Sequence, residues 1–241
     1  MPRSAGAVMS WFRTSRRSAS VVAVCLLAAA QLAGGRAAGA AAPEREAARM
    51  VFPLRGTFLV VAGHAEGEAH AEERSQRFAI DVVNVTGAGE ELRGAGTKNS
   101  DWVGFGRPVR APAGGRVVRA RDGYADNAPG TVPGVEFYRA IADPAERRLA
   151  IAGNCVVIDH GGGAFSVLAH LRRGSVRVRR GARVRAGEVV GRVGNSGNST
   201  EPHLHYHLMD GPRLLEADGL PVAFANVAAG ELRAGRVYET E

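Results

Sequence analysis

The stretch that most constrains this chain is Pro202–Leu208, in which histidines alternate with apolar residues. On a β-strand, side chains two residues apart point to the same face. The alternation therefore predicts a strand that presents its imidazoles on one face and packs its apolar residues on the other. The imidazoles belong to His203, His205 and His207, and the apolar residues are Leu204, Tyr206 and Leu208. Neutral imidazole is the commonest metal ligand among side chains, so the pattern indicates a metal site. The alternative is a half-exposed strand whose histidines share no role.

The first forty residues have the composition of an export signal. They contain five arginines and no acidic residue, an apolar run from Val21 to Leu32, and then small residues from 37 onward. That order is typical of a secretory signal peptide, and the apolar run is shorter than the roughly 20 residues that a membrane span needs. We expect a signal peptide at 1–40, cleaved after Ala40, and a mature protein in the periplasm, cell envelope or medium. An uncleaved anchor is the alternative.

Charge and cysteine content narrow the class of protein further. Lysine and arginine number 31 against 24 aspartates and glutamates, but without the leader 26 basic residues remain. The high isoelectric point therefore gives no reason to expect a nucleic-acid partner. Cys25 lies in the leader, so Cys155 stands alone in the mature domain and no internal disulfide is expected. Its apolar neighbours predict a buried thiol on a strand.

Gly-rich turns separate many short apolar runs after residue 50, and a charged, Ala-rich spacer occupies 41–49. This pattern predicts one mainly β domain over 50–241, with antiparallel sheet, a barrel-like or sandwich-like form and long loops around a groove. The expected strands are Thr57–Ala62, Phe78–Val83, Arg107–Ala111, Gly115–Ala120, Asn154–Asp159, Ala164–His170, Glu188–Val193 and His203–Met209. A short helix is expected at Pro144–Leu149, inside a long insertion at 122–153 that we place near the groove. A monomer without a membrane span in its mature form is expected.

Two polar residues lie alone in other apolar runs. Asp81 interrupts Phe78–Val83, where an isolated carboxylate is unfavourable unless a cation or another partner neutralises it. A salt bridge to Arg77 or a metal ion would each satisfy this requirement. His170 interrupts a second run, at 166–171, and is either a structural histidine or a candidate for acid–base work.

Several blocks of the chain together resemble one known family. They are Asn154–Gly161, Leu168–Leu171, Val184–Val193, Gly194–Ser199 and Pro202–His205, with Arg107–Pro112 and Gly114–Val117 before them. These blocks resemble the lysostaphin-type, or LytM-domain, zinc metallopeptidases, which are peptidoglycan endopeptidases. The resemblance covers roughly residues 51 to 210 and is most specific in the C-terminal half.

The resemblance implies a role for each matching residue. His205 and Asp81 would be zinc ligands, while His170 and His203 would flank a zinc-activated water, assist its deprotonation and stabilise the oxyanion. In this chain, Arg77 occupies the histidine position of the family's usual His-x-x-x-Asp motif. A guanidinium group cannot be a metal ligand because it stays protonated. The chain therefore resembles a subgroup whose first histidine lies further upstream. His70 is the expected third ligand and His64 is the second choice.

The remaining histidines and the competing functions stay open at this point. His207 has either a supporting contact with the metal ligands or a plain surface position, and His160 is expected to be structural. The predicted function is a zinc endopeptidase that cleaves peptidoglycan peptides. A metal-free relative that binds cell wall or activates another hydrolase is the alternative. A biotinyl or lipoyl carrier is disfavoured, because Lys98 is the one lysine and lies outside any hairpin of that kind.

Overall fold

The computed structural model describes residues 48–63, 70, 74–227 and 232–240. Its strands are β1 (Ala48–Met50), β2 (Thr57–Ala62), β3 (Ile80–Asn84), β4 (Pro108–Arg110), β5 (Gly115–Arg121), β6 (Asn154–Asp159), β7 (Phe165–Leu171), β8 (Arg183–Val184), β9 (Val189–Arg192), β10 (Leu204–Met209), β11 (Gly219–Leu220), β12 (Val222–Phe224) and β13 (Val237–Glu239). The helices are α2 (Val135–Arg139) and α3 (Pro144–Ala152), with the short 3-10 turns η2 (Arg74–Gln76) and η3 (Asn99–Asp101). The expected leader lies outside the described residues, and β1 begins two residues before the expected start of the domain.

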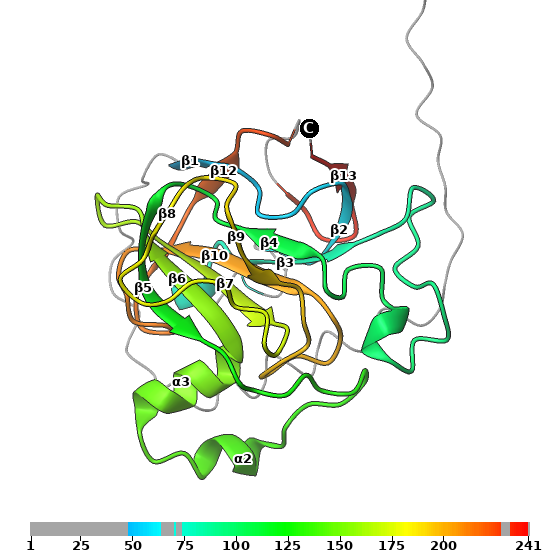
Figure 1. The fold of residues 1–241 in the computed structure, drawn as a ribbon, viewed down its shortest axis with the longest axis horizontal. Helices are drawn as coiled ribbons and strands as arrows, with labels where there is room; N and C mark the ends of the chain where they lie inside the picture. Colours follow the sequence, from blue (N-terminus) through cyan, green and yellow to red (C-terminus); the bar gives the residue numbers. More distant parts are fainter. Residues whose placement is uncertain (1–47, 64–69, 71–73, 228–231, 241) are drawn as a thin grey trace, which may run out of the picture.

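One large antiparallel sheet organises the molecule (Figure 1). Its strands follow the order β13-β2-β3-β10-β7-β6-β5-β8, and β11 pairs with the end of β10. Two small sheets complete the fold, an antiparallel β4–β9 pair and a parallel β1–β12 pair. The expectation of a mainly β, antiparallel domain is confirmed. Within the described part of the chain, no helix is long and apolar enough to cross a membrane.

All eight expected strands are present, with ends that shift by two residues at most. The unpredicted strands β1, β8, β11, β12 and β13 are only two or three residues long, which is too short for a pattern to emerge. The expected helix is α3, which begins after Asp143, whose side chain accepts a hydrogen bond from the Ala145 amide (2.8 Å). This arrangement is a regular N-cap. Helix α2 was not predicted.

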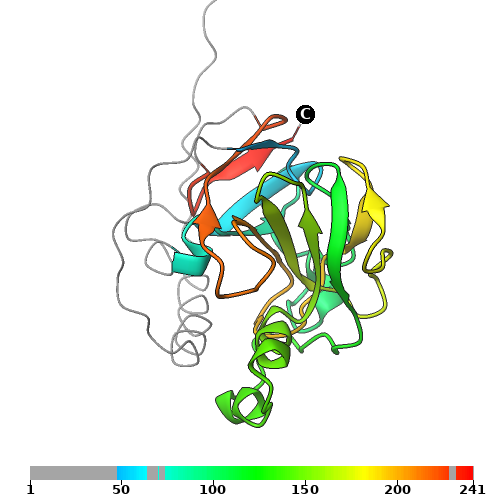
Figure 2. The same ribbon diagram turned by 90° about the vertical axis from the view of Figure 1, so that its left-hand side faces the viewer.

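The sheet, seen from a second side in Figure 2, has two faces with different contents. The main core packs on one face and includes Leu204, Tyr206 and Leu208 of β10, together with Val109 and Val190 of the β4–β9 pair. A smaller apolar cluster lies on the other face, beneath α3, and includes Met209. Because strand side chains alternate, His205 and His207 share this second face with Met209.

Cys155 lies on β6 within the smaller cluster, fully buried and without a disulfide. Burial raises the pKa of its thiol to about 12, despite opposing effects from Arg119 and Arg121. Because the thiolate is the reactive form, we expect iodoacetamide at pH 8 to leave Cys155 unmodified in the folded protein and to modify it quickly in urea. Peptide mass spectrometry provides the measurement. Equal labelling rates in the two states would contradict the buried position.

Candidate metal centre

The centre is built on the pairing of strands β3 and β10. The register places His205 directly opposite Asp81, so both side chains project from the same face of the sheet. His205 Nδ1–H donates a hydrogen bond to Asp81 Oδ1 at 2.8 Å. Asp81 makes no ion pair with Arg77, which is exposed and lies over the ring of Phe78 instead. The salt-bridge interpretation of Asp81 is therefore wrong.

His70 completes a three-residue group around the same carboxylate. Its side chain is buried, and its Nε2–H donates to Asp81 Oδ2 at 3.1 Å. One ligand atom from each of His70, Asp81 and His205 lies within 4.8 Å of the other two. Two ring nitrogens that converge on one carboxylate form the nitrogen and oxygen donor set that zinc prefers. The residues present therefore fit a divalent cation.

The ionisation states of these groups also suit a cation. Burial alone would raise the pKa of Asp81, but attraction by His70, His205 and His203 outweighs it and holds that pKa well below its ordinary value. Burial lowers the pKa of His205, although Asp81 acts in the opposite direction. An ionised carboxylate beside neutral imidazole is the state that a metal ion requires of its ligands.

A bulge in strand β7 brings His170 to the same face. Regular alternation from Leu168 would place residue 170 in the main core, yet Leu171 occupies that core instead. The pairing of β6 and β7 shifts register between Asn154 and Val156, and His170 adopts a left-handed backbone with φ of 57°. One extra residue in a strand re-aims its side chain, here toward His205, with 5.8 Å between ring centroids.

The rings of His170 and His203 lie next to each other, with their centroids 4.8 Å apart and their planes inclined by 48°. His170 Nδ1–H donates to the carbonyl of Ser196 and His203 Nδ1–H donates to the carbonyl of Glu201, each at 2.8 Å. A carbonyl can only accept, so both Nδ1 atoms carry a proton, and in a neutral ring of this kind the lone pair lies on Nε2. His203 Nε2 lies 3.7 Å from Asp81 Oδ1, on the metal-facing side.

The loop at 194–199 supplies the carbonyl that holds His170, and the sequence predicts only a turn at this place. Ser196 Oγ donates to the carbonyl of Leu171 and accepts from the amide of Asn154. Gly194 approaches the β7 end so closely that a Cβ would meet the Arg172 backbone nitrogen at 2.2 Å. Buried polar side chains in a loop mark such a supporting role, and their burial becomes visible only in the fold.

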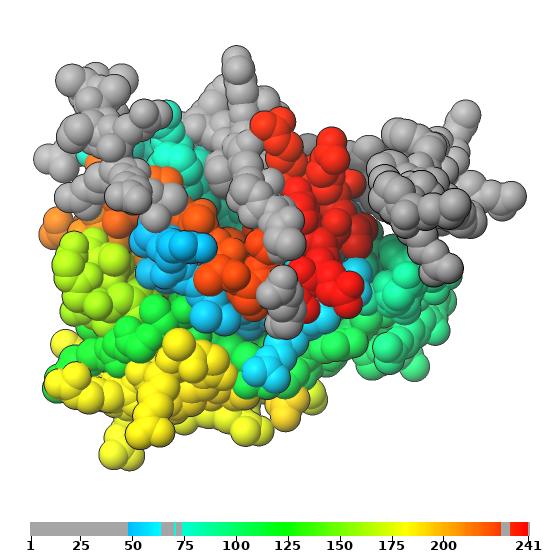
Figure 3. Space-filling view, turned by 90° about the horizontal axis from the view of Figure 1, so that it is seen from above, coloured from blue at the N-terminus to red at the C-terminus, as the bar shows by residue number. Residues whose placement is uncertain are grey.

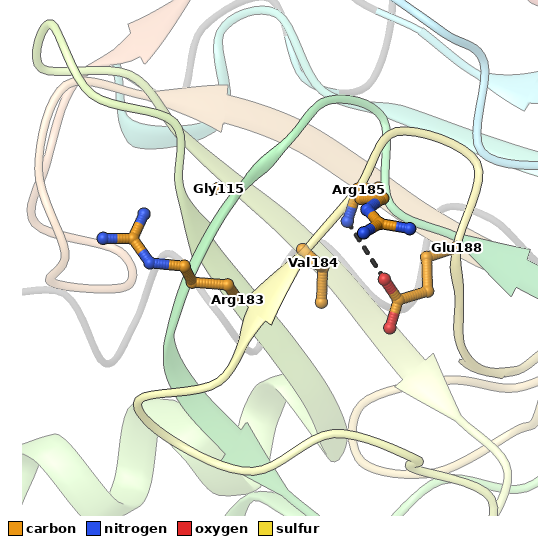
Figure 4. A pocket seen from close by; sticks show the side chains of 5 residues that line it. All are labelled: Gly115, Arg183, Val184, Arg185 and Glu188. Atoms are coloured by element: carbon orange, nitrogen blue, oxygen red, sulfur yellow. Dashed lines mark hydrogen bonds between the residues drawn. The ribbon is translucent and has the colours of Figure 1, made fainter.

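The 122–153 insertion braces the same loop. Asp126 Oδ1 accepts from the Asn195 amide at 2.8 Å, and Asn127 Nδ2 donates to the carbonyls of Gly197 and Ser199. The insertion therefore lies next to the loop that supports the site residues. A pocket of about 500 Å³ lies elsewhere, beside β5 and β8 (Figure 4).

The remaining histidines divide into one near the centre and one away from it. His207 is buried, which excludes a plain surface position, and its Nδ1 lies 2.9 Å from His205 Nε2. Burial and His205 hold its pKa well below the ordinary value. His160 is structural as expected, with ring nitrogens 2.9 Å from the Gly114 carbonyl and 2.8 Å from Ser166 Oγ. His64 lies outside the described residues.

With this geometry established, comparison with known proteins identifies the family. The profile "Peptidase family M23" matches residues 100–217, a range that includes His170, His203 and His205. The chain belongs to peptidase family M23. The two remaining members of the centre, His70 and Asp81, lie before the matched range. Asp81 joins it through the β3–β10 pairing, and His70 joins it through its contact with Asp81.

Three curated proteins are similar to part of this family member. Cell division protein DipM of Caulobacter vibrioides is 29% identical over 132 residues, which are 55% of this chain and 17% of DipM. DD-carboxypeptidase/endopeptidase Mpg of Neisseria meningitidis is 48% identical over 54 residues, 22% of this chain and 12% of Mpg. Peptidoglycan DD-endopeptidase ShyA of Vibrio cholerae is 43% identical over 58 residues, 24% of this chain and 13% of ShyA. The matches therefore span less than a fifth of each relative.

Proposed function

We propose that this M23 protein is an exported zinc endopeptidase that hydrolyses peptide bonds in bacterial peptidoglycan. The observation that carries the proposal is the convergence of His70, Asp81 and His205 beside the rings of two further histidines, His170 and His203. The matches to Mpg and ShyA support peptide cross-links of peptidoglycan as the substrate class.

The side chains divide the work of amide hydrolysis among them. His70 Nε2, Asp81 and His205 Nδ1 would hold the metal ion, which when bound polarises the scissile carbonyl and acidifies water. In the neutral rings of His170 and His203 the Nε2 atom carries the lone pair, so either ring can accept a proton from the attacking water. Once protonated, the same ring can stabilise the oxyanion or protonate the leaving amine. The HExxH helix of other zinc peptidases is absent from this sequence, so these histidines replace its glutamate base.

Digestion of purified peptidoglycan tests this proposal. We expect release of soluble fragments with new amino termini, loss of that release after complete removal of metal by a chelator, and recovery on addition of zinc. Undiminished activity in protein shown to be free of metal would refute the metal-dependent mechanism.

The metal-free alternative rests on Arg77, which stands where the family has a histidine. His70 contacts Asp81 from eleven residues upstream, so the departure at Arg77 does not leave the centre with two ligands. Metal analysis separates the two proposals, because about one zinc per chain is expected for a catalytic site and none for a degenerate binding domain.

The choice between His70 and His64 leads to a paired prediction. We expect His70→Ala to lower the zinc content of the purified protein several-fold, because a three-ligand site loses one ligand. His64→Ala is the matched control and should keep the wild-type zinc content. Mass spectrometry of metals provides the measurement, and the reverse result would assign the ligand role to His64.

We propose the remaining features from the sequence. Residues 1–40 form a signal peptide, 41–49 a spacer and 50–241 the peptidase domain, which acts as a monomer in the periplasm, cell envelope or medium. N-terminal sequencing of the exported protein tests the cleavage after Ala40.

A further inference from the structure

A strongly basic segment connects strands β7 and β9 and has no part in the metal centre. Residues 172–185 contain seven arginines and neither aspartate nor glutamate. The arginines are Arg172, Arg173, Arg177, Arg179, Arg180, Arg183 and Arg185, and all seven are exposed. We call them the arginine strip. In the space-filling view the segment forms the yellow lower margin of the molecule (Figure 3).

The local packing explains why these side chains face outward. Val176, Val178 and Ala182 pack against the main core, so the intervening Arg177, Arg179 and Arg180 face the solvent. Backbone hydrogen bonds tie the segment down, including Arg177 N to the Val190 carbonyl and Gly181 N to the Val117 carbonyl. The strip is therefore a fixed surface of the fold.

The positive charge of the strip is largely uncompensated. None of the seven arginines forms an ion pair with another residue that the structure describes. Three carboxylates lie near the segment, those of Asp122, Asp126 and Glu188. Each of these carboxylates accepts at least one hydrogen bond from the backbone amides of residues 172–185. Figure 4 shows Glu188 beside Arg185, while the side chain of Arg183 extends away from both. The excess of arginines over these carboxylates leaves the surface strongly positive.

The geometry favours an extended anionic surface as the partner. The guanidinium groups spread along an outward strip, and Glu188 disfavours a small anion in the pocket beside Arg183 and Arg185. Guanidinium groups bind phosphate oxygens through two parallel hydrogen bonds, and several in a row suit an array of phosphates. The strip lies over the core face of the sheet, whereas His205 and His207 lie on the opposite face. A partner bound to the strip would therefore leave the metal centre accessible to substrate.

We propose that the arginine strip docks this protein on a membrane surface through anionic phospholipid headgroups. The expected export leader brings the chain to a membrane, and docking through the strip would turn the metal centre away from the bilayer. The proposal does not depend on the peptidase activity, because it concerns the opposite face of the sheet.

Vesicle sedimentation with the full chain tests the proposal. Phosphatidylcholine vesicles with phosphatidylglycerol should bind the protein, phosphatidylcholine alone should bind it far less, and added salt should weaken binding by screening. The triple variant R177Q/R179Q/R180Q should lose roughly a hundredfold in vesicle affinity, at about fivefold for each arginine near an anionic surface. The matched control R93Q/R139Q/R213Q has the same net charge and should lose much less.

Both variants keep the leader, so the difference between their vesicle affinities reports on the strip alone. Equal zinc content and equal circular dichroism spectra would show that both variants are folded. Equal loss in the two variants, or wild-type binding that ignores lipid charge and salt, would overturn the proposal. A defect of the strip variant in binding isolated cell walls, with unchanged vesicle binding, would also overturn it and would assign the surface to an anionic wall polymer. Peptidoglycan digestion is measured separately, so failure of the proposed function remains distinguishable.

Discussion

Replacing Asp81 with asparagine is expected to remove metal binding and peptidase activity together. Asp81 contacts both His70 and His205, and it supplies the negative charge of the site. An amide of the same shape keeps the packing but loses that charge, so zinc affinity should fall by orders of magnitude. Without the cation's electrostatic contribution of several kcal/mol, hydrolysis of peptidoglycan should slow by at least about a thousandfold. Metal analysis and a digestion assay on the same preparation measure both effects.

The matched control is Asp210→Asn, which removes an exposed carboxylate directly after β10. We expect this variant to keep both zinc and activity. Retention of full zinc content in Asp81→Asn would contradict the assignment of Asp81 as a ligand, whatever its activity.

Replacing His170 or His203 with alanine should separate activity from metal binding. Neither ring belongs to the proposed ligand group of His70, Asp81 and His205, so the zinc content should stay near that of the wild type. Each ring presents an Nε2 lone pair for proton transfer, a contribution typically worth about 10²- to 10⁴-fold in rate. We therefore expect activity to fall by that amount in each variant. The double variant should lose less than the product of the two losses, because the rings act together.

The pKa of His170 strengthens this expectation. Burial and the neighbouring His203 hold that pKa well below its ordinary value, so the ring stays neutral at pH 7 and can accept a proton. The matched control is His160→Ala, a histidine that bonds Gly114 and Ser166 away from the centre, and this variant should keep its activity per folded molecule. Zinc loss in His170→Ala equal to that in Asp81→Asn would contradict the proposed division of roles.

Alternation in the sequence predicted the central strand and the contents of its two faces. Leu204 and Tyr206 lie in the main core and His205 lies opposite, because the side-chain period of a strand is two wherever the strand is regular. The same reasoning placed eight strands correctly within two residues. It missed five strands of two or three residues, most of which gain their hydrogen bonds from neighbours far away in the sequence.

The position of His170 shows where alternation stops being informative. A histidine two residues after Leu168 should share its face, and only the bulge turns it toward the metal centre. A non-glycine residue with a positive φ is rare and leaves no composition signal, so the turn could not be read from the sequence. Family resemblance suggested the role of His170, and the structure supplies the geometric reason for it.

The supporting contacts were equally hidden, because they join distant segments. Ser196, Asp126 and His70 each act on a residue that a different element provides. Pairing of β3 with β10 is needed before Asp81 and His205, which are 124 positions apart, can meet. Such pairings follow from the complete fold, whereas local patterns predict only which residues are available.

Anomalous X-ray diffraction from crystals of the zinc-loaded protein, measured on both sides of the zinc absorption edge, would show which side chains bind the metal ion. We expect one strong peak among His70 Nε2, the Asp81 carboxylate and His205 Nδ1, with His170 and His203 beside it. A zinc peak bound by other side chains, or no peak at this position in protein that digests peptidoglycan, would contradict this expectation.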